Sequence, residues 1–163
     1  MVGDASIEDW MDKEFGRARR RALLRRISAW LRRSGSRRLA SFEEAKAELP
    51  GAEKVRLGKR RVRVEKIVGS VGRRADFDRD FLPTTSSGAE RWKRVNRTYR
   101  KFGKLPPVSL YKVGGEHFVL DGNHRVSVAR YHGEDSIEAE VVEFRPRRAS
   151  GDNDGTRRAG ATA

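Results

Sequence analysis

The chain has 163 residues, of which 36% are hydrophobic and 37% are charged, and its net charge at pH 7 is +14. No apolar run approaches the roughly 18 residues needed to span a bilayer, and the N-terminus MVGDASIEDW lacks the pattern of a secretory signal. The absence of cysteine excludes disulfides, thiolate metal sites and cysteine nucleophiles. We therefore expect one cytoplasmic domain with polar ends. Its positive charge predicts a polyanionic partner, which could be DNA, RNA, an acidic membrane or an acidic protein.

A long amphipathic helix is predicted over residues 6–33, because apolar residues recur there at steps of three and four and Ser6 with Asp9 resembles a capping box. Residues 17–38 contain ten arginines and no acid, which is typical of an arm that binds nucleic acid. Alternatively, the charges form a solvated face, and the apolar stripe packs on the core, on a second copy in a homodimer or on a partner protein. The candidate nucleic-acid-binding residues are Arg19, Arg20, Arg21, Arg25, Arg26, Arg32 and Arg33.

Two elements and a loop follow the first helix. Ser41 and Glu44 form a second capping box before a helix over 42–49, and Pro50-Gly51 ends that helix. Alternation then predicts one strand over 53–68, whose inward residues are Val62, Val64 and Ile67. The polar stretch 69–88 is expected to be a loop.

The second half of the chain predicts four further elements. Ser87 and Glu90 resemble a third capping box, at the start of a helix with an aromatic core stripe over 88–102. A hairpin is expected over 108–120, followed by a helix over 123–132 and a strand over 137–144. The aromatic stripe consists of Trp92, Val95, Tyr99 and Phe102.

These elements predict an α+β fold with a small mixed β-sheet and packed helices. We place this domain at 53–145, with a basic α-helical extension over 1–52 before it. The remaining residues, 146–163, have almost no apolar content and are expected to be a disordered tail.

The stretch DGNHR lies where a strand turns into a helix. Gly122 suits a sharp turn, and Asn123 can cap the new helix. The first amides of a helix lack carbonyl partners and carry partial positive charge, so an anion suits that end. His124 and Arg125 add donors there, which predicts a phosphate cradle; a capped helix with an incidental surface arginine is the alternative. Asp121 would then contact Mg²⁺ beside the phosphates.

The hairpin, DGNHR, VSVAR, a glycine and a closing strand together resemble the ParB/sulfiredoxin superfamily over about 62–144. The matching turn holds the triphosphate of CTP in ParB proteins and the phosphates of ATP in sulfiredoxins, and free-serine kinases have a similar Asp-Gly-His-His-Arg. The resemblance implies that Gly122, Asn123, His124 and Arg125 bind a nucleoside triphosphate, CTP or ATP, with Mg²⁺. Asn123 stands where sulfiredoxins have their cysteine, so sulfinic acid reduction by that mechanism is excluded.

A second wall of the same pocket is expected from Gly69, Ser70 and Arg73, because the superfamily closes its site with this segment. The alternative is a flexible basic loop. The stretch lacks the Asn-Pro-x-Gln-Pro lettering of the ParB box, which leaves CTP hydrolysis open.

Three classes of function follow. The first is a ParB-like module that binds a nucleoside triphosphate at the turn and DNA through the arginine-rich helix. The second is an enzyme on the same scaffold, namely a nuclease, a nucleoside triphosphatase or an ATP-dependent kinase of a small molecule. The third is a protein-interaction adaptor that uses the N-terminal helix.

Candidate catalytic carboxylates are Glu65, Asp76, Asp78 and Asp121, with Asp80 a further member of a nuclease cluster. His117, Asp121 and His124 are a candidate metal set, although their spacing matches no strong metal motif.

Overall fold

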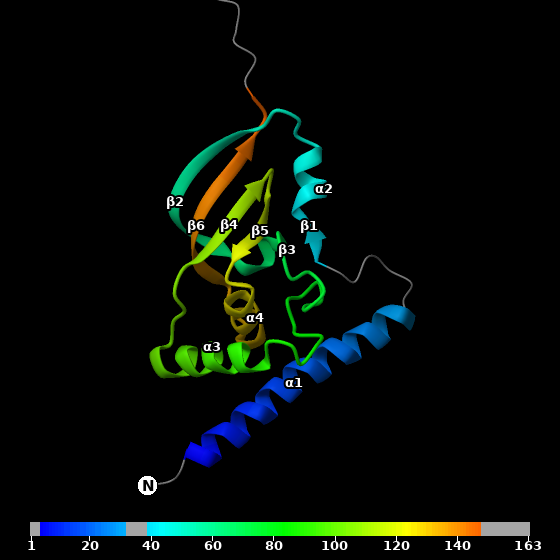
Figure 1. Cartoon of the computed structure of the whole chain (residues 1–163), viewed down its shortest axis with the longest axis vertical. Coiled ribbons are helices and arrows are strands. Elements are labelled where there is room, and N and C mark those ends of the chain that lie inside the picture. Colours follow the sequence, from blue (N-terminus) through cyan, green and yellow to red (C-terminus); the bar gives the residue numbers. More distant parts are fainter. Residues whose placement is uncertain (1–3, 32–38, 148–163) are drawn as a thin grey trace, which may run out of the picture.

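A six-stranded mixed sheet forms the centre of the molecule in the computed structural model, which describes residues 4–31 and 39–147. Within the first of these ranges, the side chains of residues 7–22 are described. Figure 1 shows α4 directly below the strands, α2 beside them at the upper right, and α3 and α1 at the bottom. This arrangement confirms the predicted α+β fold class.

The strands lie in the order β1-β3-β5-β4-β6-β2. Neighbours are parallel except for two antiparallel pairs, β5 with β4 and β6 with β2. The strands are β1 (Ala40–Ser41), β2 (Glu53–Arg63), β3 (Ile67–Ser70), β4 (Val108–Val113), β5 (Glu116–Asp121) and β6 (Ser136–Arg145). The helices are α1 (Asp4–Leu31), α2 (Phe42–Ala47), α3 (Ala89–Phe102) and α4 (Asn123–His132), with a 3-10 helix over Val64–Lys66.

The hairpin of β4 and β5, the helix α4 and the strand β6 confirm the sequence prediction for the second half of the chain. The single strand predicted over 53–68 was wrong. The chain leaves the sheet after β2, passes through the 3-10 helix and re-enters the sheet as β3, from which β5, β4 and β6 separate β2. Val62, Val64 and Ile67 are all buried, as expected. The step of three from Val64 to Ile67 breaks the period of two and marks the turn.

The main core lies between α4 and one face of the sheet. Val126 and Ala129 of α4 belong to a core cluster with apolar residues of the five strands β2, β3, β4, β5 and β6. Phe77 and Phe81, in the segment predicted as a loop, join the same core. That segment is therefore held to the domain by its own aromatic side chains.

The other face of the sheet is covered by α2. The ring of Phe42 lies 4.9 Å from Tyr111, 5.9 Å from Phe118 and 5.2 Å from Phe144, measured between ring centroids. Ser41 caps α2 by accepting the amide of Glu44 at 3.4 Å, which confirms the second capping box. Because β1 pairs with β3 and α2 completes this face, the packed domain starts well before residue 53.

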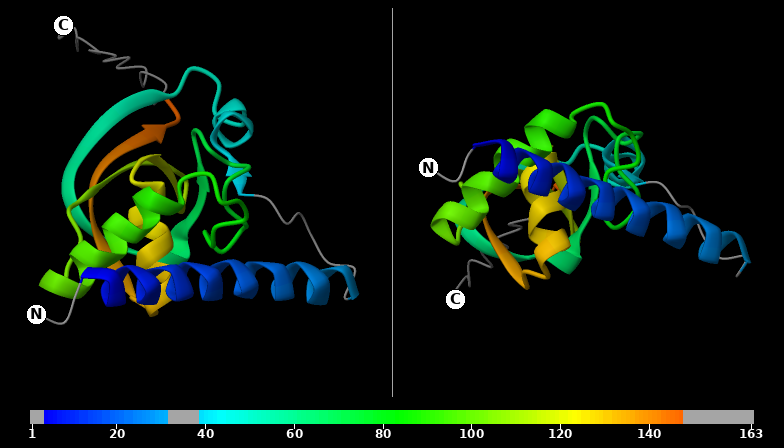
Figure 2. Two further views of the ribbon diagram at one scale, coloured as in Figure 1. Left: turned by 60° about the horizontal axis from the view of Figure 1, so that its bottom comes forward. Right: turned by 90° about the horizontal axis from the view of Figure 1, so that it is seen from below.

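Helix α1 lies across α3 and α4, and its C-terminal turns run past the rest of the domain (Figure 2). The apolar stripe packs on its own domain, with Phe15 at 5.6 Å from the ring of Trp92. Its buried residues are therefore covered by the same chain, while Ile7 at the start of the stripe is exposed. Its buried members are Met11, Phe15, Ala18 and Ala22. Ser6 and Asp9 lie inside the helix, so the first capping box was wrong.

A buried polar network joins α1 to α3 and α4. Asn96 Nδ2 donates to Glu14 Oε2 at 2.8 Å, and Arg100 Nη2 donates to Glu14 Oε1 at 2.6 Å. His132 Nε2 donates to Asn96 Oδ1 at 2.7 Å. A buried carboxylate is tolerated only when it is paired and hydrogen-bonded, so the network fixes where α1 docks.

Within the described ranges, no helix has the length and apolar character to cross a membrane.

We predict that Phe15→Ala lowers the free energy of unfolding of the whole domain by about 3 kcal/mol, because it removes a ring packed on Trp92 and leaves a cavity. Urea unfolding monitored by circular dichroism measures this change. Ile7→Ala on the same helix is the control, since Ile7 is 49% exposed and should cost less than about 0.5 kcal/mol. Equal stabilities of the two variants would contradict the packing of α1.

Candidate functional site

The turn into α4 requires glycine at position 122. Gly122 has φ +106°, and a Cβ there would lie 2.7 Å from Val108 Cγ1 and 2.9 Å from Arg125 Nε. Gly122 is itself the N-cap residue, and the Val126 amide donates to its carbonyl at 3.0 Å. Asn123 is the first residue of the helix, so its predicted capping role was wrong. The turn therefore leaves the side chain of Asn123 free of a capping bond.

The N-terminus of α3 meets the N-terminus of α4 at His124. The N-cap of α3 is Gly88, with φ +87°, and a Cβ there would lie 2.8 Å from His124 Cε1. The capping box predicted from Ser87 and Glu90 does not form, and Glu90 instead accepts a bond from Lys93 at 2.7 Å. The amides that open both helices and the positive ends of both dipoles are consequently close to one imidazole ring.

His124 is buried, with 6% of its surface exposed, and neither ring nitrogen has a hydrogen-bond partner among the described residues. Its ring lies edge-on to Phe77 at 5.2 Å. Burial lowers the pKa of His124 to about 4, and the positive charges of Arg91 and Arg73 act in the same direction. The ring is therefore neutral at pH 7, with one N–H to donate and one nitrogen to accept.

A cavity of about 480 Å³ lies at this corner. Asn123 also lines it, with 9% of its surface exposed and its Oδ1 without a partner in the described structure. A buried polar atom without a partner costs roughly 1–3 kcal/mol, so two such side chains on one cavity point to a ligand. The lining residues are Gly72, Arg73, Arg91, Val95, Leu120, Asp121, Gly122, Asn123, His124 and Arg125.

Arg125 is partly engaged by the protein itself. Its two terminal nitrogens donate to the carbonyl of Pro107 and to the carboxylate of Asp121. The Asp121 side chain is 74% exposed, so this ion pair lies at the rim of the cavity. The guanidinium predicted to face phosphate therefore already has a counter-ion, which a ligand would have to share or displace.

Of the residues predicted for the second wall, Arg73 lines the cavity together with Gly72, whereas Gly69 and Ser70 do not. Gly69 lies inside β3, where a Cβ would come within 2.6 Å of the ring of Phe118. Ser70 is fully buried, and its Oγ lies within hydrogen-bonding distance of two carbonyl oxygens, that of Val119 at 3.2 Å and that of Gly72. Gly69 and Ser70 thus have structural roles where the loop leaves β3.

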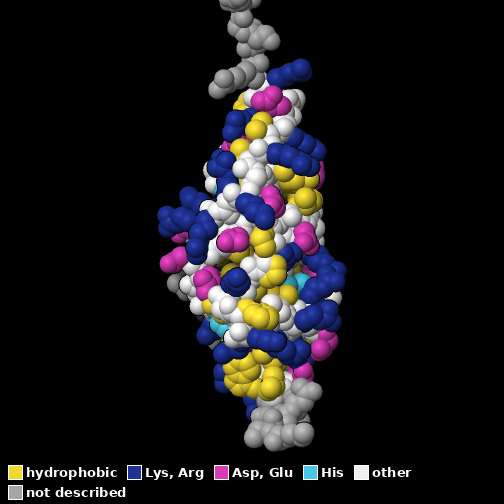
Figure 3. All heavy atoms as spheres, turned by 90° about the vertical axis from the view of Figure 1, so that its left-hand side faces the viewer, with side chains coloured by type: hydrophobic (Ala, Val, Ile, Leu, Met, Phe, Trp, Pro, Cys, Tyr) yellow, Lys and Arg dark blue, Asp and Glu magenta, His cyan; other side chains and the backbone are white. Residues whose placement is uncertain are grey.

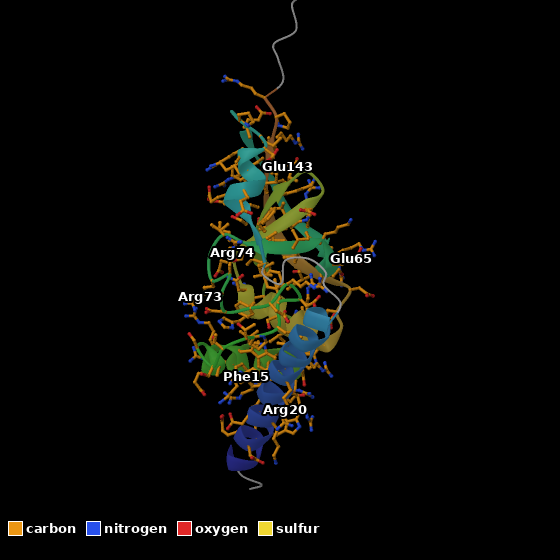
Figure 4. The ribbon with its side chains drawn as sticks, turned by 90° about the vertical axis from the view of Figure 1, so that its right-hand side faces the viewer. Phe15, Arg20, Glu65, Arg73, Arg74 and Glu143 are labelled. Atoms are coloured by element: carbon orange, nitrogen blue, oxygen red, sulfur yellow. The ribbon has the colours of Figure 1, made fainter. Side chains whose placement is uncertain are left out.

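Arg73 takes the left-handed conformation, with φ +52°, which is uncommon for a residue with a side chain. It pairs with Asp76 at 3.3 Å. Figure 4 shows Arg73 and Arg74 on the loop that follows β3. Arg74 Nε donates to the carbonyl of Leu39 at 3.1 Å, so of the two arginines Arg73 is the one that lines the cavity.

The predicted catalytic carboxylates do not gather at one place. Asp121 lines the cavity and Asp76 holds Arg73. Asp78 is buried and its Oδ1 accepts the amides of Asp80 and Leu82, both at 2.9 Å, so it shapes the loop. Glu65 pairs with Arg63 at 2.9 Å, and together with Asp80 it lines a different cavity, beyond the C-terminal end of α4.

The described residues contain no group of three or more His, Asp or Glu side chains that could hold a metal ion. The metal set proposed from His117, Asp121 and His124 was therefore wrong. His117 lies in β5, and burial lowers its pKa. Asp121 remains a candidate for a metal ion that a ligand's phosphates would help to hold.

Arg91 is a candidate residue that sequence reasoning missed. It is exposed, lies in the first turn of α3, lines the cavity, and has no ion pair or hydrogen bond with another described residue. A cation is unfavourable at the positive end of a helix. An arginine three residues after a capping glycine is the sequence signal that could have indicated an anion there.

The proposed nucleic-acid-binding arginines are only partly described. Arg19 and Arg20 are exposed on α1, where Figure 4 labels Arg20. Arg21 lies over the ring of Tyr131 at 4.9 Å. The side chains of Arg25, Arg26, Arg32 and Arg33 fall outside the described residues. Lys and Arg side chains are spread over the face shown in Figure 3, with acidic groups between them.

Neither a protein-family model nor a curated protein sequence matches this chain. Among solved structures, it is similar to sulfiredoxin from Arabidopsis thaliana, with a TM-score of 0.39 and 20% sequence identity. The match covers 51% of this chain and 82% of the sulfiredoxin chain.

We predict that the His124 ring makes folding pH-dependent. Its pKa falls from 6.5 to about 4 on folding, so the unfolded chain binds the proton more tightly between these values. The neutral ring's contribution to the free energy of unfolding is complete above pH 6.5 and is lost as the pH falls toward 4. The loss is about 2 kcal/mol between pH 7 and 4.5. Urea unfolding of wild type and His124→Gln at both pH values measures this difference.

The two other histidines are present in both proteins, so the comparison isolates His124. An equal loss of stability in the two proteins, or an imidazole that titrates near its ordinary value by NMR, would contradict the buried neutral ring.

Proposed function

We propose that this chain binds the phosphate groups of a nucleoside triphosphate in the cavity between the N-termini of α3 and α4. The observation that carries the proposal is the pair of buried side chains, Asn123 and His124, whose polar atoms lack partners and line that cavity. Helix N-termini accept anions without further adjustment, because their first amides point outward and their dipoles favour negative charge.

The chemistry of each group suits a phosphorylated ligand. Neutral His124 donates its N–H to a phosphate oxygen without the cost of charging a buried ring. Arg73 and Arg91 supply charge from two further segments of the chain. Asn123 Oδ1 requires a donor, and a ribose hydroxyl or a magnesium-bound water is such a group.

Mg²⁺ fits this corner through Asp121, whose carboxylate is at the rim and exposed. Mg²⁺ is commonly held by one or two carboxylates together with phosphates and water, and it neutralises part of the phosphate charge. Asp121 and Arg125 form an ion pair with each other. Magnesium and phosphate would replace this pair by two new ones, Asp121 with the metal and Arg125 with the phosphate.

We expect CTP, ATP, GTP or UTP with Mg²⁺ to raise the melting temperature of the protein, since a ligand that binds only the folded state stabilises it. His124→Ala and Arg125→Ala should remove the shift, because each deletes a donor to the phosphates. Arg94→Ala is the matched control, because it removes an exposed arginine of α3 that lies one turn after Arg91 and outside the cavity. If no nucleotide shifts the wild type, or both variants respond as it does, the proposal fails.

We propose, as a second function, that α1 binds DNA through its outward arginines. The observation in its favour is that Phe15 and Ala18 anchor the helix to the domain while Arg19 and Arg20 remain exposed. A helix held in this way presents its charges without the entropy cost of ordering a free arm. The net charge of +14 adds long-range attraction to phosphate backbones.

We predict that the double variant Arg19→Ala, Arg20→Ala binds a DNA duplex more weakly and reduces the slope of log affinity against log salt by about 2, since each phosphate contact contributes close to one. Fluorescence anisotropy at several salt concentrations measures both effects. The control removes two exposed cations from β2, Arg56→Ala and Lys59→Ala, on the other side of the molecule from α1. Equal losses in the two double variants would show attraction to net charge and no interface on α1.

A further inference from the structure

We propose that the outer edge of β2 is a docking surface for an extended, acidic segment of a partner protein, which adds a further strand to the sheet. β2 stands at the end of the strand order, and Figure 1 shows it as the outermost strand. It pairs with β6 on one side, and no described backbone segment pairs with its other side. None of its residues lines the cavity at the DGNHR turn, so the proposal is independent of the phosphate site.

The register determines which backbone groups of β2 face the outer edge. The amide of Val64 donates to the carbonyl of Asp135 at 2.9 Å. These two residues lie directly opposite each other, because the antiparallel register pairs Arg63 with Ser136 and is uninterrupted back to Gly58. Opposite residues alternate between pairs that exchange two hydrogen bonds and pairs that exchange none. The residues whose N–H and C=O groups point away from β6 are therefore Lys59, Arg61 and Arg63.

The side chains of these three residues are basic and exposed, on the face of the sheet opposite to buried Val62. β6 already supplies acids to two of them. Lys59 lies opposite Glu140, and Arg61 lies opposite Glu138. Opposite charges directly across a ladder favour strand pairing, and like charges oppose it. β6 thus shows the side-chain pattern that β2 accepts in a neighbour, namely an acid at every second position with apolar residues between.

Charge distinguishes the possible occupants of the edge. A second copy pairing through β2 would place lysines and arginines against each other, which repel. The phosphates of a nucleic acid would meet Glu138 and Glu140 on the same face of the sheet. An extended acidic peptide pairs its backbone with the edge and places its carboxylates opposite the cations. Its apolar residues would lie on the core side of the sheet, beside Val62.

Basic side chains on an edge strand also deter aggregation. Deterrence requires charge alone. Docking of a strand requires acids at alternate positions and backbone amides that face β2. Peptides that differ only in the order of their residues, or only in one set of amides, therefore separate the two roles.

Fluorescence anisotropy of the full chain with the labelled peptide Thr-Glu-Val-Glu-Val-Glu-Thr tests the proposal. In an antiparallel arrangement its glutamates lie opposite Arg63, Arg61 and Lys59. We expect saturable binding, and at least about tenfold weaker binding of Glu-Glu-Glu-Thr-Val-Val-Thr, which has the same composition without the alternation. Methylation of the glutamate amides should abolish binding, because those amides face β2. Methylation of the valine amides, which face away, should be tolerated.

The double variant Lys59→Ala, Arg61→Ala should bind the alternating peptide about fivefold more weakly, since two cross-strand charge pairs are lost. Arg19→Ala, Arg20→Ala removes the same charge from α1 and is the matched control, which should bind as the wild type does. All four side chains are exposed, and circular dichroism checks that both variants keep the fold.

The proposal is overturned if the alternating peptide does not bind the wild type at about millimolar concentration. Equal binding of the two peptides would show that the edge attracts any polyanion, and equal losses in the two double variants would show the same for the whole protein. Binding that survives methylation of the glutamate amides would exclude strand addition. A wild-type dimer in sedimentation that the β2 double variant converts to a monomer would show that a second copy occupies the edge.

Discussion

The close approach of Gly88 to the imidazole of His124 is the contact on which the rest of the site depends. A side chain at position 88 would reach to 2.8 Å of the ring, so the two helices can start against each other only because it is absent. Gly122 likewise has no side chain that would clash with Val108 at the start of α4. Between them, the two glycines allow a neutral, buried imidazole to sit at the positive ends of two helices. The nitrogens of this ring have no hydrogen-bond partner in the described structure, which lowers the stability of the fold. Functional sites often carry such a cost.

Much of this corner could be predicted from the sequence, because its determinants are local. Strand, Gly122 and an amphipathic helix occur within a few residues, and Gly114-Gly115 marks the hairpin before them. The contact of Gly88 with His124 joins residues far apart in the chain, and no local pattern encodes it. For the same reason the wall of the cavity was assigned to Gly69 and Ser70 besides Arg73, whereas the turn brings Gly72 to it beside Arg73.

Helix α1 shows a similar division. Its apolar period predicted an amphipathic helix, but the period could not tell whether its own domain or another molecule covers the stripe. Glu14 lies among the stripe residues, one turn from Met11 and Ala18. An acid in that position needs a specific partner, and Asn96 and Arg100 of the same chain provide it. The acid within the stripe is thus matched by partners in the same chain.

The position of β6 between β4 and β2 has a consequence for synthesis on the ribosome. Residues 53–63 emerge early, yet their neighbour in the sheet is made only with residues 136–145. Until then an eleven-residue strand exposes unpaired amides and carbonyls on both sides. Closely spaced lysines and arginines along it would keep such nascent chains apart by mutual repulsion. The basic residues of β2 are thus suited to protecting the chain before it folds.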